Sequence, residues 1–136
     1  MTVWITISTV RKSGRDSEKF ELSTAGEMTL LTDGCVLLYP ESEAIGLSGV
    51  MTTMTLKKDC VTMSRRGTLN TLMVMELGKR THCDYDAGYG RLLMGIYTSE
   101  ILIDIDENGG EARFCYTLDI NAGITSEHLI MVKVSV

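Results

Sequence analysis

The sequence predicts an all-β domain whose antiparallel strands close into a barrel of about 8–10 strands, a calycin-like or lipocalin-like architecture. Residues 111–120 alternate polar and apolar side chains without interruption, and residues 100–106 do the same. A period of two places one set of side chains on each face of a strand, which a helix cannot do. Asn108-Gly109 lies between these segments, and Asn-Gly supplies the positive φ angles of a tight hairpin.

Alternation and turn signals predict the other strands in order. The expected strands are residues 3–8, 20–24, 28–32, 35–39, 50–57, 60–66, 70–77, 89–97, 100–106, 111–120 and 126–136. Polar residues 11–17 are expected to link the first two, while Asp33-Gly34 and Lys58-Asp59 mark hairpins. The last segment is apolar to its end, which indicates pairing on both sides. Because closure removes two exposed sheet edges, we expect one barrel domain over residues 1–136.

The composition and charge argue against a protein that binds nucleic acid. The chain has 136 residues, 44% of them hydrophobic and 23% charged, which is typical of one globular domain. The formal net charge is −5, and lysine and arginine occur in no cluster larger than a doublet. An acidic chain without a basic stripe is poorly suited to phosphate backbones, so we expect no nucleic-acid partner.

The four cysteines and the start of the chain predict a cytoplasmic protein. The first residues show no basic region followed by a long apolar run, and no segment has the ~20 apolar residues of a membrane span. We therefore expect no export signal and no membrane partner. Cys35, Cys60, Cys83 and Cys115 are unevenly spaced and form no Cys-x-x-Cys motif, so four reduced thiols are expected.

No pattern in the sequence indicates catalysis, a metal or a cofactor. In His82-Cys83-Asp84 the neighbouring side chains would point to opposite faces of a strand, so they cannot converge on one ion. The carboxylates of the alternating segments show no spacing that favours an acid/base pair. Gly88-Tyr-Gly-Arg matches no phosphate-binding loop, and no helix follows it. We therefore expect a protein that is not an enzyme.

Several short motifs, in a shared order and spacing, resemble the YwiB-like family of small uncharacterised bacterial proteins. They are Thr24-Ala25-Gly26, Tyr39-Pro40-Glu41, Thr52, Arg65-Arg66-Gly67, Gly78, Tyr85 with Tyr89-Gly90, Thr98, Gly110 and Tyr116. Gly88 stands where the family often has proline, so the local turn is expected to differ. The resemblance implies a calycin-like barrel and assigns no activity. Calycins in general carry small apolar ligands, which is analogy at the level of the fold.

Arg65 and Tyr116 are the main candidate ligand-binding residues. Arg65 is expected on the same strand face as Val61 and Met63, because it lies four and two positions after them. Tyr116 is likewise expected on the same face as Phe114. If these rows face the interior, a guanidinium and a phenol project into an apolar chamber and could anchor an amphipathic carboxylate. The structural alternative is that Arg65 bonds carbonyl groups at the rim and Tyr116 is a core residue.

Tyr85 and Tyr89 are further candidates, because they flank small residues between two expected strands. They form either a gate at the barrel mouth or a packed corner. Two functions therefore stay open: a carrier of a small apolar or amphipathic molecule, and an interaction module with a filled barrel, which includes a homodimer. The size of the interior separates them, because a binder is expected to hold about 300 Å³ or more.

Overall fold

The computed structural model describes residues 1–41, 49–68, 70–86, 91–120 and 123–136, and these form ten strands. The strands are β1 (Thr2–Ser13), β2 (Asp16–Leu31), β3 (Gly34–Pro40), β4 (Val50–Lys57), β5 (Cys60–Gly67), β6 (Thr71–Glu76), β7 (Arg80–Asp86), β8 (Arg91–Asp106), β9 (Gly109–Ile120) and β10 (Ile124–Ser135). No helix in this part of the chain is long and apolar enough to cross a membrane.

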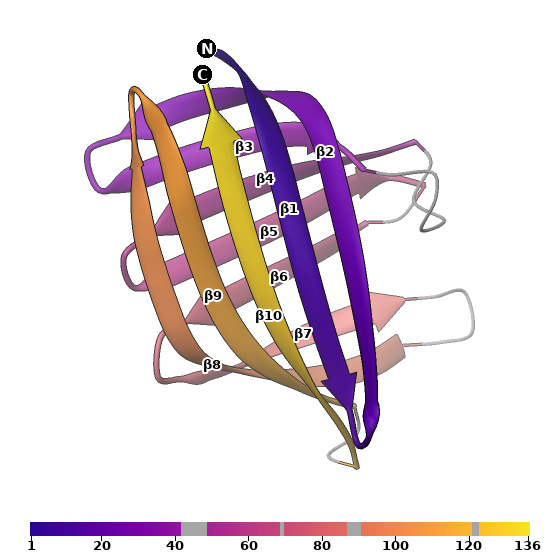
Figure 1. The fold of residues 1–136 in the computed structure, drawn as a ribbon. Coiled ribbons are helices and arrows are strands. Elements are labelled where there is room, and N and C mark those ends of the chain that lie inside the picture. Colours follow the sequence, from indigo (N-terminus) through magenta and orange to yellow (C-terminus); the bar gives the residue numbers. More distant parts are fainter. Residues whose placement is uncertain (42–48, 69, 87–90, 121–122) are drawn as a thin grey trace.

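All ten strands belong to one antiparallel sheet, in the order β6-β5-β4-β3-β2-β1-β10-β9-β8-β7. Figure 1 shows two layers that cross steeply, with β1, β9 and β10 in front and β3–β7 behind. The long strands β2 and β8 belong to both layers, because each pairs with a front strand and with a rear strand. The first and last strands lie side by side, so β10 pairs on both sides, as its apolar sequence predicts.

The predicted all-β architecture is confirmed, with differences in where strands begin and end. Segments 20–24 and 28–32 form one strand, β2, and segments 89–97 and 100–106 fall within β8 or just before it. β1 and β2 extend into the expected link, which shortens to Gly14-Arg15, and Gly14 has φ of 60°. The expected strands did not include β7, although His82-Cys83-Asp84 was considered as part of a strand, because its polar residues hide the alternation.

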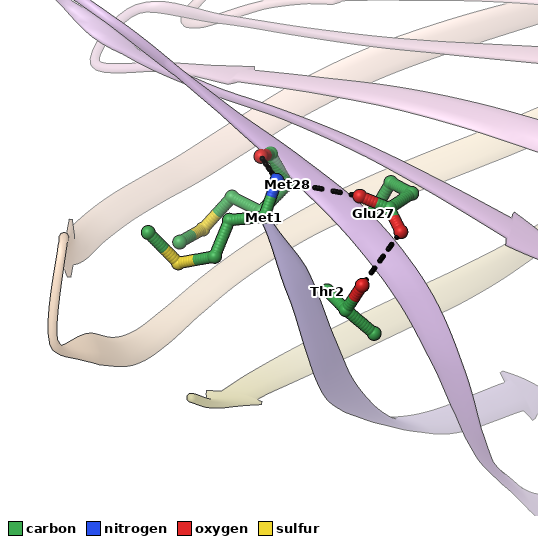
Figure 2. Close-up of polar contacts among 4 residues, drawn as sticks. All are labelled: Met1, Thr2, Glu27 and Met28. Atoms are coloured by element: carbon green, nitrogen blue, oxygen red, sulfur yellow. Dashed lines mark hydrogen bonds and ion pairs between the residues drawn. The ribbon is translucent and has the colours of Figure 1, made fainter.

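A glycine allows β2 to pass from one layer to the other. A Cβ atom on Gly26 would lie 2.6 Å from both Ile5 Cδ1 and the Leu38 carbonyl oxygen. The absent side chain thus lets β2 bend tightly over β1 and β3. Figure 2 shows the next residue, Glu27, contacting the start of β1: the Thr2 hydroxyl donates to Glu27 Oε1 at 2.9 Å, and the Met1 amino group lies 3.3 Å from Oε2. The Thr2 bond and the amino group lower the pKa of Glu27.

The barrel closes between β6 and β7 without a backbone ladder. Side chains of β7 donate to carbonyl groups of β6 instead: Thr81 Oγ1 to Val74 at 2.5 Å, and Cys83 Sγ to Leu72 at 3.0 Å. The closure expected from the sequence is therefore made at this seam by a hydroxyl and a thiol, which satisfy edge carbonyls that would otherwise need water.

Alternating side chains of every strand fill most of the space between the layers. The largest fully buried ones include Tyr39, Phe114, Ile5, Leu37, Met54, Leu56, Met75 and Ile96. They belong to one continuous cluster of apolar side chains drawn from both layers. Burial of this size is the main stabilising contribution to the fold.

No disulfide joins the four cysteines, and the sheet order explains why. They lie on β3, β5, β7 and β9, and along the sheet another strand always separates the nearest two. Strands are about 4.8 Å apart, so such cysteines are about 10 Å apart or more, beyond the ~7 Å reach of a disulfide. We expect thiol titration of the protein in denaturant, without reductant, to count four thiols. A reproducible count of two or none would contradict this register.

Candidate ligand pocket between the layers

A pocket of about 240 Å³ lies between the front and rear layers, and we call it the interlayer pocket. Its lining comes from β1, β2, β9 and β10 on one side and from the β3, β5 and β6 region on the other. The lining residues are Ile7, Thr9, Arg11, Phe20, Leu22, Tyr39, Glu41, Met63, Arg65, Met73, Tyr116, His128 and Ile130. Arg11 and Phe20 are exposed, so the pocket communicates with solvent beside them.

The rear wall holds a polar cluster built around a buried carboxylate. Glu41 follows β3, and its side chain is 4% exposed. Thr52 Oγ1 donates to Glu41 Oε1 at 2.5 Å, and Arg65 Nε lies 3.5 Å from the same oxygen. Arg65 Nε is buried yet makes no hydrogen bond among the described residues, so its contact with Glu41 is electrostatic. Burial raises the pKa of the Tyr39 phenol, and the neighbouring Glu41 carboxylate raises it further.

The front wall carries two stacked rings, Tyr116 on β9 and His128 on β10. Tyr116 and His128 are direct cross-strand neighbours, with centroids 4.7 Å apart and planes inclined by 4°. Phe114, a buried core residue, also stacks with Tyr116, with ring centroids 6.4 Å apart. Ser126 Oγ lies 2.9 Å from His128 Nε2, which holds the imidazole in place. The stack gives the pocket a flat, rigid wall.

Both ionisable rings of this wall are neutral at pH 7. Burial raises the pKa of Tyr116 to about 12, although the positive charges of Arg65 and Arg11 oppose that shift. Burial, helped by the charge of Arg11, lowers the pKa of His128 to about 4. The formal charges of the lining are therefore two guanidinium groups and one carboxylate, an excess of one positive charge in a protein of net charge −5.

The structure brings two of the four sequence candidates together. Arg65 and Tyr116 line the same pocket from opposite layers, although 50 residues separate them in sequence. Tyr85 lies within β7, not between strands as expected. Its side chain is outside the part of the chain that the structure describes. Tyr89 lies outside the described residues.

Sequence reasoning missed three polar residues of this pocket. Glu41 stood out only as part of the family motif Tyr39-Pro40-Glu41, His128 was not among the candidates, and Arg11 was placed in a link. The alternation of inward and outward side chains along the strands could have identified two of them. Arg11 continues the inward row of Ile5 and Ile7, and His128 shares parity with Ile130. Nothing comparable identified Glu41, because it is not in a strand.

Two larger hollows lie on the outer surface of the front layer. One, of about 540 Å³, is lined by residues that include Val10, Cys115 and Leu129. The other, of about 580 Å³, is lined by residues that include Leu102 and Met131, which are 60% and 46% exposed. Both lack the buried charged groups of the interlayer pocket. Within the described residues, no three His, Cys, Asp or Glu side chains are placed to hold a metal ion.

Comparison with known proteins identifies the family but no activity. The model of a family described as "Domain of unknown function (DUF1934)" matches residues 5–132. The chain belongs to this family. It is also similar to the crystal structure of the ywiB protein from Bacillus subtilis, at 21% identity and a TM-score of 0.77, over 99% of this chain and 92% of that one.

The likeness to the ywiB protein shows the fold, and it confirms the YwiB-like barrel expected from the sequence motifs. A search of curated proteins found no match.

His128 makes the stability of the DUF1934 barrel depend on pH. Its pKa is about 4 in the folded protein against 6.5 as the ordinary value, so below pH 6.5 the unfolded chain binds a proton that the folded protein does not. Stability is therefore complete above about pH 6.5 and falls as pH drops toward 4. We expect a loss of about 1–2 kcal/mol for this half-buried ring.

Urea unfolding at pH 7.5 and at pH 4.5, compared between wild type and His128→Gln, measures this dependence. The wild type should lose more stability on acidification than the variant, because carboxylates contribute equally to both. Equal losses would contradict the assignment of a neutral His128.

Proposed function

We propose that this protein binds a small amphipathic anion in the interlayer pocket, without catalysing a reaction. The observation that carries the proposal is a guanidinium, Arg65, placed between an apolar lining and a stacked Tyr116. Glu41 compensates one positive charge, and the second guanidinium, Arg11, has no ion-pair partner among the described residues. A carboxylate would supply the missing negative charge and accept charge-assisted hydrogen bonds.

The size of the pocket limits the ligand. At about 240 Å³ it is smaller than the 300 Å³ expected of a binder, so by size alone the interior is closer to the filled barrel of the alternative, and only a small ligand fits. A continuous cluster of core side chains packs around the pocket. A ligand with a short apolar part fits best, in contact with Ile7, Met63 and Ile130, while its charged group lies near the two arginines.

Titration with hexanoate, and with hexanol as an uncharged control of similar length, tests this proposal. We expect hexanoate to bind at least about tenfold more tightly than hexanol, since a charge-assisted bond contributes about 1.5–3 kcal/mol. Failure of both compounds to bind, or equal binding of both, would contradict an anion site.

The outer face supports a second candidate, an interaction module that includes a homodimer. Leu102 and Met131 are exposed beside the 580 Å³ hollow, and mixed charges such as Arg113 and Glu111 surround them. Exposed apolar groups framed by charges suit a protein partner. A native mass spectrum showing a dimer without a bound small molecule would favour this alternative. For either function we propose a cytoplasmic location, because four separated thiols suit a reducing compartment.

A further inference from the structure

His128 lines the interlayer pocket together with both arginines. On the inner face of the front layer it pairs with Tyr116 on β9 and with Arg11 on β1. Arg65 reaches the same pocket from β5 in the rear layer. The imidazole is fixed by its stack on Tyr116 and by Ser126 at 2.9 Å. It is therefore a titratable ring held within the proposed anion site.

The two cations of the interlayer pocket oppose protonation of His128 while the pocket holds no anion, and the neighbouring carboxylates, Glu127 on β10 and Glu18 on β2, are both exposed to solvent. Arg11 is positive and next to it on β1, and Arg65 is positive across the pocket. Tyr116 on β9 and Ser126 on β10 are neutral. The only carboxylate of the lining, Glu41, is already engaged by Thr52 and Arg65. Burial and Arg11 accordingly lower the pKa of the imidazole.

An anion bound between the two arginines favours the protonated form of His128 instead. Its negative charge offsets the guanidinium groups and attracts an imidazolium directly. We propose that ligand binding is coupled to protonation of His128, so that the protein takes up a proton with its anion and binds it more tightly as pH falls. This inference rests on the proposed anion binding and defines how that site is regulated. Linkage requires the two effects to be reciprocal.

The coupling is measured best with hexane-1-sulfonate, because a sulfonate stays ionised throughout the range. Titration calorimetry near pH 5.5, in buffers of different ionisation enthalpy, reports the protons taken up per ligand bound. We expect an uptake approaching one proton and an affinity about tenfold higher near pH 5.5 than near pH 7.5. The variant His128→Gln keeps a polar partner for Ser126 but cannot be protonated in this pH range. Whatever its affinity, it should therefore show neither the proton uptake nor the tighter binding at low pH.

Imidazole signals in NMR provide a readout that does not depend on the variant. The chain has two histidines, and His82 is exposed on β7 and does not line the interlayer pocket, although it lines a separate hollow together with Arg65. The sulfonate should raise the titration midpoint of His128. Chemical shift changes at His82 would instead place the sulfonate in the hollow that His82 shares with Arg65.

The outcomes separate the two proposals. Binding of the sulfonate without proton uptake, or an equal pH dependence in His128→Gln, would overturn the coupling and leave anion binding in place. Binding of neither hexanoate nor the sulfonate at any pH would overturn both.

Discussion

Replacing Arg65 with methionine should weaken hexanoate binding by about 1.5–3 kcal/mol, roughly 10- to 150-fold. Methionine keeps the length and the apolar stem of the side chain but removes the guanidinium. Tyr116 and the apolar lining would remain, so the loss reports the charge. Titration calorimetry on both proteins measures it. If Arg65 serves only to anchor the barrel, the same variant should lower stability and leave hexanoate binding unchanged.

Glu41 complicates that variant, because it would be left as a buried carboxylate without a cation, next to the hydroxyl groups of Thr52 and Tyr39. Breaking a buried pair on one side can cost about 3–5 kcal/mol of stability, less here because Arg65 is 27% exposed. The double variant Arg65→Met/Glu41→Gln removes both charges and should regain stability without regaining affinity. Arg113→Met is the matched control. It removes an arginine on the outer face, paired with Glu100 at 2.8 Å, and should leave binding unchanged.

Replacing Gly34 with alanine should cost at least about 3 kcal/mol of stability, at the upper end of the cost of overpacking. Gly34 begins β3 and pairs with both Leu31 and Lys57. A Cβ atom there would lie 1.9 Å from the carbonyl oxygen of Leu56, which belongs to the backbone of β4 and cannot move without disturbing the ladder. The measurement is urea unfolding at pH 7.5.

Gly14→Ala is the control for Gly34→Ala. Gly14 has φ of 60°, but a Cβ atom on it would meet nothing within 4 Å. Its replacement should cost only about 1–2 kcal/mol for the left-handed backbone. The glycine with the unusual φ is therefore expected to be the less sensitive one. Equal losses in the two variants would contradict the close approach of β3 and β4.

The sequence predicted most of the fold because alternation and hairpin signals are local. Residues 111–120 and the hairpin at Asn108 were identified from the pattern alone. Errors occurred where a tertiary contact decides the structure. Nothing local shows that segments 20–24 and 28–32 are one strand bending at Gly26, because the cause is the approach of Ile5 and Leu38. Likewise β7 is held through Thr81 and Cys83 by the edge of β6, which the sequence does not display.

The candidate site was predictable in part for the same reason. Strand parity alone placed Arg65 and Tyr116 among inward rows, and the structure brings them to one pocket. Parity could not show that Glu41 would partner Arg65. That contact depends on where the chain leaves β3, opposite Thr52 on β4.

The central claim is that a small anion binds between the layers, and methionine methyl NMR tests it most directly. Met63 and Met73 line the interlayer pocket, whereas Met51 and Met131 are exposed outside it. Hexanoate should shift the methyl signals of Met63 and Met73 in a saturable manner and leave those of Met51 and Met131 in place. Shifts at Met131 without shifts at Met63 and Met73 would contradict the interior site and place binding on the outer face.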